Sequence, residues 1–296
     1  MVAGESGWGV PLLAAAFGAA VGSFANVVIY RSPLEGLSSL RPARSFCPHC
    51  RAPIGWSDNI PVVSWLLLRA RCRACRAPIS VRYPLVELAV ALLFAVAALR
   101  FPPLDALGVG RLLVAFYLIA ACVIVTFIDL EHTIIPDTIT WPGMLLGVLA
   151  AVALPALHEG HIGFRADAPR SSALLASLFG LAAGAGSLVV VGQLGNLFMR
   201  RKMKAAGLQD SMGWGDVKWM GLAGAFLGVG SVFGAILIGC FAGAFVGLLM
   251  IPVAKLRGQE TPVGLPFGPF LAVGMLCELF APGLAWALLG RLTGAG

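Results

Sequence analysis

The sequence predicts an all-α, polytopic membrane protein with about eight transmembrane helices and one long polar loop. Hydrophobic residues make up 59% of the 296 residues, and the mean hydropathy is +0.90. Both values exceed what a water-soluble domain needs for its core. Apolar runs of about 20 residues, the length that crosses a bilayer, recur along nearly the whole chain. We therefore expect lipid to surround most of the protein.

Eight apolar runs are the predicted spans. We divide the stretch from Trp219 to Val253 at residues 228–231, because it is too long for one crossing and its Gly and Ser residues permit a tight reversal. The segment before that reversal is consequently a short helix. The predicted spans are residues 9–30, 84–99, 111–128, 138–156, 171–198, 217–230, 231–254 and 267–290.

The distribution of basic residues predicts the orientation of the helices. No Lys or Arg precedes the first run and several follow it, which is the reverse of a secretory signal peptide, so we expect a retained helix. Cytoplasmic loops carry the excess of Lys and Arg, which places residues 31–83, 129–137, 199–218 and 255–266 in the cytoplasm and both termini outside. Of the 21 basic residues, those left outside are Arg100, Arg111, Arg165, Arg170 and Arg291.

The formal charge of +7 is interpreted as a signal of this topology. A nucleic-acid-binding surface joins its basic residues into one patch laced with aromatic residues, whereas here they are divided among loops. We therefore expect no nucleic acid as a partner. The expected partner of the basic loops is the lipid bilayer, through its anionic headgroups.

The long polar insertion at residues 31–83 carries two CxxC motifs, Cys47 to Cys50 and Cys72 to Cys75. Two such knuckles predict a structural zinc site in which the four thiolates close a tetrahedral shell. The alternative is two disulfides, which the reducing environment expected around a cytoplasmic loop disfavours. A loop of this size has too small a core to fold without a staple of one kind or the other.

Two aspartates at predicted helix ends are the candidate catalytic residues. Asp129 ends the third predicted span and Asp216 begins the sixth, so the topology puts both at similar depth on the cytoplasmic side. Two carboxyl groups that meet share a proton, and one can then activate water while the other protonates a leaving amine. The pair predicts an aspartyl peptidase. Either aspartate alone is more often a cap or an ion-pair partner.

The neighbouring residues have simpler interpretations beside a supporting role. Gly213 and Gly215, in the GxGD motif that ends at Asp216, would let a substrate backbone approach closely. Asp216 alone would suit a helix N-cap, and Lys218 an anchor at the membrane interface. For Asp137 we favour the N-cap of the following helix over a catalytic role, because a proline that cannot continue a helix precedes it.

Glu278 falls in the middle of the eighth predicted span, where a carboxylate must be protonated or paired, and the sequence identifies no partner for it. It is the feature that favours an alternative function, an ion-coupled transporter. Transporters place such charges between inverted repeats, and no repeat is detected. A further alternative, a membrane-tethered zinc module that recruits a partner, does not require two aspartates at matched depth.

Several segments together resemble the bacterial type IV prepilin leader peptidases, GxGD-type aspartyl proteases that include those of type II secretion. The resemblance extends over nearly the whole chain, and the order and spacing of the segments are more specific than any one of them. The segments are residues 22–31, the two CxxC knuckles, and residues 83–88, 129–137, 213–218 and 265–270.

The resemblance implies substrates and a second activity. The substrates would be type IV prepilins and pseudopilins, whose short basic leader is removed after a glycine at the cytoplasmic face of the bacterial inner membrane. Asp129 and Asp216 match the catalytic positions of the family. Members with the cysteine loop usually also N-methylate the new N-terminus with S-adenosylmethionine; the alternative is a peptidase without methyltransferase activity. No glycine-rich nucleotide-binding fingerprint is present, which leaves Glu87 and the cytoplasmic loop as candidates for the donor site.

We therefore predict three parts of the chain. Residues 1–30 form the first transmembrane helix, residues 31–83 a cytoplasmic zinc-binding loop domain, and residues 84–296 the transmembrane aspartyl peptidase core.

Overall fold

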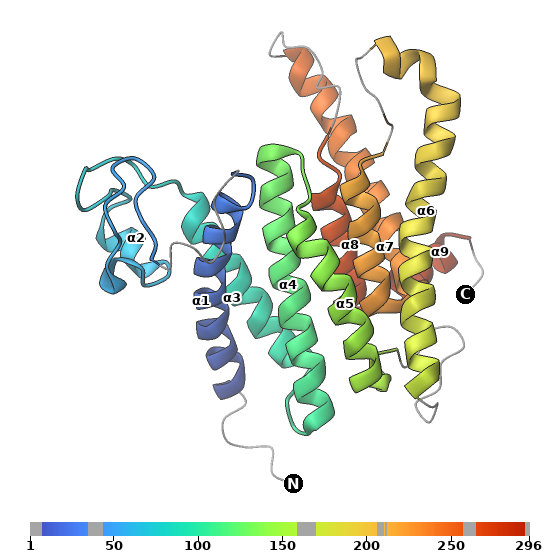
Figure 1. Ribbon diagram of the computed structural model, residues 1–296, viewed down its shortest axis with the longest axis horizontal. Coiled ribbons are helices and arrows are strands. Elements are labelled where there is room, and N and C mark those ends of the chain that lie inside the picture. The colour runs from blue at the N-terminus through green and yellow to red at the C-terminus, as the bar shows by residue number, and fades with distance from the viewer. Residues whose placement is uncertain are drawn as a thin grey trace. The chain divides into compact units, whose positions relative to one another are not determined.

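The computed structural model describes residues 8–34, 44–158, 170–205, 210, 212–256 and 265–293. Over these residues the regular secondary structure is helical (Figure 1), and the β pairs are the isolated bridges Phe46–Pro53 and Arg71–Pro78. The predicted all-α fold is confirmed. The chain divides into two compact units, Met1–Ile128 and Asp129–Gly296, and each is described by itself.

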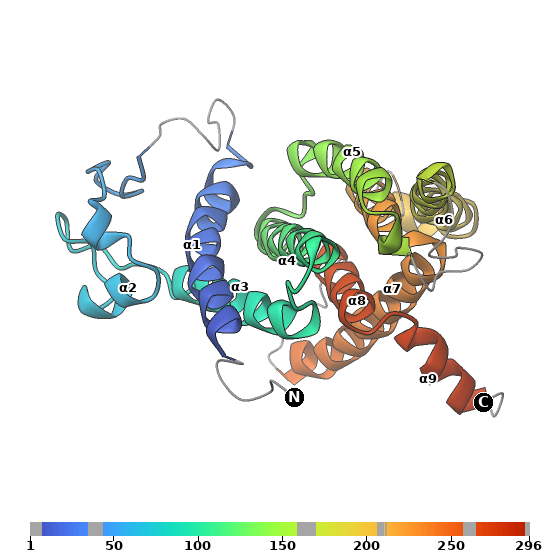
Figure 2. The same cartoon turned by 90° about the horizontal axis from the view of Figure 1, so that it is seen from below.

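The first unit is built on two helices that cross closely, α1 and α3 (Figure 2). A Cβ atom added to Gly22 of α1 would lie 2.7 Å from the Cα atom of Glu87 in α3, so only glycine permits this approach. Small residues at such crossings are typical of membrane helices. The elements of this unit are α1 (Gly9–Arg31), η1 (Trp56–Asp58), α2 (Val63–Leu67), α3 (Arg82–Arg100) and most of α4 (Ala106–His132).

In the second unit, the described residues form the end of α4 and five further α-helices. Its closest crossing joins α6 to α7, where a Cβ atom on Gly224 would collide with the carbonyl group of Gly180. Ser177 of α6, one turn before Gly180, donates a 2.8 Å hydrogen bond to the carbonyl oxygen of Ala225 in α7. The elements are α5 (Asp137–Ala153), η2 (Pro155–His158), α6 (Arg170–Ala205), α7 (Trp214–Leu256), α8 (Gly268–Phe280) and α9 (Leu284–Thr293).

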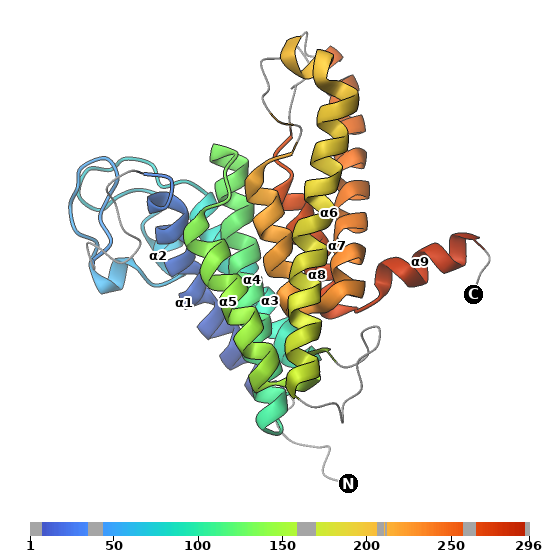
Figure 3. The same ribbon diagram turned by 45° about the vertical axis from the view of Figure 1, so that its right-hand side comes forward.

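Helix α7 is interrupted at Gly228, whose backbone angles are φ 74° and ψ 177°. Only glycine adopts this conformation readily, because it has no Cβ atom. The two halves of α7 run in opposite directions on either side of the break (Figure 3). The predicted division of the long apolar stretch at residues 228–231 is therefore confirmed.

The eighth predicted span, residues 267–290, is not one helix. It is broken between α8 and α9, which are bent by 91°. The carboxylate of Glu278 lies at the break and accepts hydrogen bonds from the backbone N–H groups of Gly283 at 2.7 Å and Ala285 at 3.3 Å. It thus satisfies donors that the first turn of a helix leaves unpaired. Glu278, which had no partner in the sequence, caps α9 and stabilises the bend.

The described helices fit a polytopic membrane protein. Five of them, α1, α3, α4, α6 and α7, are long and apolar enough to cross a membrane, and α8 with α9 can form one broken span. Helix α5 is apolar but has only 17 residues. Since α7 contributes two segments, the number of crossing segments agrees with the predicted value of about eight.

Candidate functional site

Asp129 lies in the last turn of α4 and is 5% exposed. Its Oδ2 atom accepts a 2.9 Å hydrogen bond from the backbone N–H of Gly268, the first residue of α8. The N-terminus of a helix carries a partial positive charge and unpaired N–H groups, so it stabilises an anion. The backbone N–H of Gly268 therefore holds the side chain of Asp129 at the N-terminus of α8.

Asp216 lies in the first turn of α7, close enough to Asp129 for their charges to interact. Its carboxylate accepts a hydrogen bond from the backbone of Gly213, and its charge interacts with that of Asp129. Asp216 is therefore not the N-cap residue, because α7 begins at Trp214; its side chain instead bonds back to the residue before the helix, as in a capping box.

Ile135 connects the surroundings of the two aspartates. A Cβ atom on Gly215 would lie 2.9 Å from the Cβ atom of Ile135, and one on Gly268 would lie 3.2 Å from its Cδ1 atom. Ile135 is buried, so the segment after α4, the start of α7 and the start of α8 pack on one side chain. The structure thus brings Asp129 and Asp216 to the same end of the second unit, as their predicted depths suggested. Their catalytic roles remain a prediction.

Asp137 and Lys218 form an ion pair between the start of α5 and the first turns of α7. The predicted N-cap role of Asp137 is wrong, because Pro136 occupies the N-cap position and no side chain caps this helix. Lys218 on α7 explains why the prediction fails, because its positive charge attracts the Asp137 carboxylate away from the backbone of α5. Lys218 is 23% exposed at its side chain, and it is a partner of Asp137 rather than a freely solvated anchor.

The ion pair between Asp137 and Lys218 is expected to contribute little on its own. The Asp137 side chain is 59% exposed, and exposed pairs stabilise by about 0 to 1 kcal/mol. We expect Asp137→Asn to reduce the rate of substrate cleavage by less than about tenfold. A loss as large as that of an Asp129 variant, measured on folded protein, would instead make Asp137 catalytic.

Gly268 is a residue of this site that the chemistry of the sequence motifs does not indicate. A Cβ atom on it would lie 2.7 Å from Oδ2 of Asp129. Only glycine fits at this position, because the Asp129 carboxylate occupies the space of a side chain. The available signal was a glycine between two prolines and phenylalanines, at residues 266–270, just before an apolar run. That pattern indicates a close approach at a helix start, but not which group approaches.

Gly268→Ala is therefore expected to reduce cleavage by about 100-fold, the usual cost of a misplacement near 1 Å at a reacting group. The added methyl group must displace the Asp129 carboxylate. Turnover of substrate by purified protein measures the effect. The matched control is Gly186→Ala, because a Cβ atom there meets nothing within 4 Å; equal activity of both variants would show that the position of Asp129 is unimportant.

The two CxxC motifs of the first unit converge on one point. The four Sγ atoms of Cys47, Cys50, Cys72 and Cys75 all lie within 4.8 Å of one another, and those of Cys47 and Cys75 are 3.9 Å apart. A tetrahedral zinc ion with bonds of about 2.3 Å requires sulfur–sulfur edges of about 3.8 Å. The donor set and its spacing fit a zinc ion, and the four cysteines form no disulfide.

The electrostatics of the four thiols also favour a cation. Hydrogen bonds from the backbone of Cys75 and Ala74 lower the pKa of the Cys72 thiol to about 7. The Cys75 thiol accepts a backbone hydrogen bond from Ala77 that lowers its pKa, but desolvation and the neighbouring thiols outweigh it and raise the pKa to about 11. Four sulfurs this close therefore cannot all ionise unless a metal ion compensates their charge.

Glu87 of α3 is buried in the first unit and its carboxylate is already bonded. It accepts a 2.7 Å hydrogen bond from the backbone N–H of Val62 and a further one from the Ser23 hydroxyl. Val62 has a positive φ of 61°, which is unusual for a β-branched residue, and the bond to Glu87 helps to hold it. Glu87 thus ties the long loop to the helix pair; its role toward a methyl donor stays a prediction.

Comparison with known proteins gives one consistent result. Residues 116–248 match the family described as "Type IV leader peptidase family", and residues 16–101 match "Bacterial Peptidase A24 N-terminal domain". No solved structure matches the chain significantly.

Three similar relatives have printed names that agree with these families. The chain is 39% identical over 269 residues to the "Prepilin leader peptidase/N-methyltransferase" of Myxococcus xanthus, covering 90% of this chain and 71% of the relative. It is 36% identical to the protein of the same name from Aeromonas hydrophila, covering 87% and 86%. A 33% identical relative from Escherichia coli is called "Type 4 prepilin-like proteins leader peptide-processing enzyme", with 93% and 95% covered.

Proposed function

This chain belongs to the type IV leader peptidase family, and on that premise we propose that it removes the leader peptides of prepilins and N-methylates the new N-terminus. Asp129 and Asp216 would be its catalytic pair. The observation that carries the proposal is their convergence around Gly268 and Ile135, with a backbone donor on each carboxylate. The alternative function, an ion-coupled transporter, loses the feature that favoured it, because the Glu278 carboxylate caps α9 at the α8–α9 bend.

The proposed substrates are type IV prepilins and pseudopilins, inserted as membrane helices with a short basic leader. The protein is a multi-pass protein of the inner membrane. We propose that both termini lie outside and that the aspartates lie at the cytoplasmic face, as the basic loops predict. A scissile bond after a glycine would then stand at the depth of the aspartates, because glycine favours local unwinding of the substrate helix.

The proposed mechanism uses the two carboxyl groups and one water. One carboxylate removes a proton from the water, whose oxygen attacks the carbonyl carbon of the scissile peptide bond. The other, protonated, hydrogen-bonds the carbonyl oxygen and gives a proton to the leaving amine as the carbon–nitrogen bond breaks. The backbone N–H of Gly268 orients Asp129, and that of Gly213 orients Asp216. Gly213 and Gly215 permit the close packing around the pair, because a Cβ atom on Gly213 would lie 3.1 Å from Oδ2 of Asp216 and one on Gly215 would lie 2.9 Å from the Cβ atom of Ile135.

The loop at residues 31–83 is the proposed zinc-binding domain, between a first helix at 1–30 and a peptidase core at 84–296. A zinc ion held by Cys47, Cys50, Cys72 and Cys75 would supply folding energy, because a closed four-sulfur shell has no open position for chemistry. S-adenosylmethionine is the methyl donor that the methyltransferase activity requires. We propose that its binding site lies in the cytoplasmic loop, with Glu87 as a candidate residue.

One reaction tests both activities. Purified protein would be incubated with a prepilin and isotopically labelled S-adenosylmethionine, and the products measured by mass spectrometry. The expected product lacks the leader and carries one labelled methyl group on its new N-terminal residue. An intact prepilin would contradict the peptidase proposal, and a cleaved but unmethylated product would establish a peptidase without methyltransferase activity.

A further inference from the structure

The short helix α2 of the long loop exposes apolar side chains. Val63, Leu66 and Leu67 follow the i, i+3, i+4 spacing of one helix face, and they are 46%, 61% and 76% exposed. Ile60 and Trp56, just before this helix, are 41% and 85% exposed. A soluble module would bury such a stripe. We call these five residues the α2 face.

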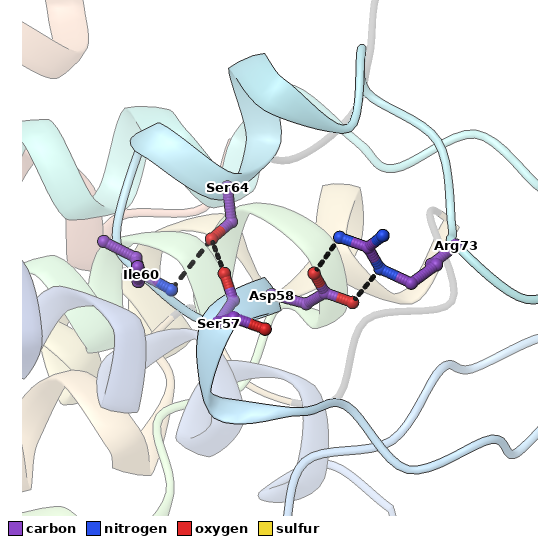
Figure 4. A network of polar contacts seen from close by, with 5 residues as sticks. All are labelled: Ser57, Asp58, Ile60, Ser64 and Arg73. Carbon is purple, nitrogen blue, oxygen red and sulfur yellow. Dashed lines mark hydrogen bonds and ion pairs between the residues drawn. The ribbon is translucent and has the colours of Figure 1, made fainter.

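Polar contacts hold Ser64, on the adjacent side of α2, in the interior of the loop (Figure 4). The hydroxyl of Ser64, which is buried, accepts a 2.9 Å hydrogen bond from the Ile60 N–H and donates one of 2.9 Å to the carbonyl oxygen of Ser57. Beside them, Arg73 donates two hydrogen bonds to Asp58, at 2.7 and 2.6 Å. The second cysteine knuckle is thereby tied to η1, and the α2 face is held pointing away from the loop's own interior.

Glu87 places the start of α2 beside a membrane span. The N–H of Val62, the residue before α2, donates its 2.7 Å hydrogen bond to a residue five positions inside α3. At about 1.5 Å per residue, that is about 7.5 Å along the helix axis from its first residue. Since α3 is long and apolar enough to cross the membrane, α2 begins at the level of the first turns of a span, where headgroups meet acyl chains.

The charges around α2 fit that location. Arg69 and Arg71 come shortly after α2, Arg76 follows the second cysteine knuckle, and all three are exposed. Between residues 44 and 81 the one acidic residue is Asp58, and Arg73 neutralises it. Exposed arginines beside an apolar stripe and a tryptophan are the combination that binds the interface of an anionic membrane.

We propose that the α2 face is a membrane-docking surface: Trp56, Ile60, Val63, Leu66 and Leu67 enter the interfacial layer of the same bilayer that α1 and α3 cross, and Arg69, Arg71 and Arg76 bind anionic lipid headgroups. The occupant of the face is lipid, because the hydrogen bond to Glu87 fixes the face at interfacial depth and the arginines match the charge of the headgroups. Docking would hold the cysteine cluster against the membrane surface.

The test measures how deeply Trp56 is immersed. The full-length, zinc-loaded chain would be placed as single copies in nanodiscs of phosphatidylcholine, with or without phosphatidylglycerol. The fluorescence that is lost on Trp56→Phe isolates this residue from the other tryptophans. We expect lipids brominated near the headgroup to quench it more strongly than aqueous iodide does, and phosphatidylglycerol to increase the quenching.

Two variants and a control complete the test. Leu66→Ser with Leu67→Ser is expected to reduce the lipid quenching of Trp56 at least twofold, and replacing the three arginines with Gln should remove only the phosphatidylglycerol effect. The control is Leu104→Ser, an 88% exposed leucine outside the α2 face, which should change nothing. Zinc content checks that each variant is folded. Full iodide access in nanodiscs, or lipid protection that appears only when prepilin is added, would overturn the proposal.

Discussion

Asp129→Asn and Asp216→Asn should each abolish prepilin cleavage, with a loss of at least about 1,000-fold, because the amide can neither accept nor release the proton that the reaction moves. Asparagine has nearly the same shape, and the N–H of Gly268 can still bond the side-chain oxygen at position 129. Folding should therefore be retained. Cleavage of a purified prepilin, followed by mass spectrometry over a time course, measures the loss.

The matched control for these variants is Glu131→Gln. Glu131 lies two residues after Asp129, on the same last turn of α4, and is exposed. The same chemical change there should leave cleavage within about twofold of the unmodified chain, as surface substitutions usually do. A variant at position 129 or 216 that keeps its activity would remove that aspartate from the mechanism.

Cys47→Ser combined with Cys50→Ser should remove the metal and unfold the loop around it. Unmodified protein is expected to contain about one zinc ion per chain, and binding by four thiolates contributes on the order of 10 kcal/mol to the folding of such a module. With half of the ligands gone, the isolated bridges Phe46–Pro53 and Arg71–Pro78 have little else to hold them. Elemental analysis and protease sensitivity of residues 44–81 report the two effects.

Cys240→Ser is the control for the zinc prediction, since Cys240 lies in α7 outside the cluster. It should keep the full zinc content and the same protease pattern. A metal-free unmodified chain with a protease-resistant loop and full activity would contradict the zinc assignment.

The sequence predicted the parts of the site that follow from periodicity and charge. Asp129 and Asp216 each end or begin an apolar run, so their shared depth followed from the topology alone. The reversal at residues 228–231 was visible because small residues interrupt a run that is too long to cross once. These features depend on local composition, which a single sequence contains.

The features that depend on partners distant in the sequence could not be predicted. The sequence places Glu278 inside a predicted span without a partner. Only the fold shows that the N–H groups of Gly283 and Ala285 donate hydrogen bonds to it. The sequence around Asp137 indicates an N-cap, but in the fold Asp137 pairs with Lys218, which is 81 residues away in the sequence. Gly268 is required by contact with Asp129, across 139 residues.

A shared catalytic site requires that the side chains at positions 129 and 216 meet, and chemical cross-linking measures this. Asp129→Cys with Asp216→Cys would be treated in membranes with a short thiol-to-thiol cross-linker, and the joined peptides identified by mass spectrometry. We expect a cross-link between these two positions and none in the matched pair Glu131→Cys with Asp216→Cys. Absence of the first cross-link, both with and without bound prepilin, would contradict a shared catalytic site.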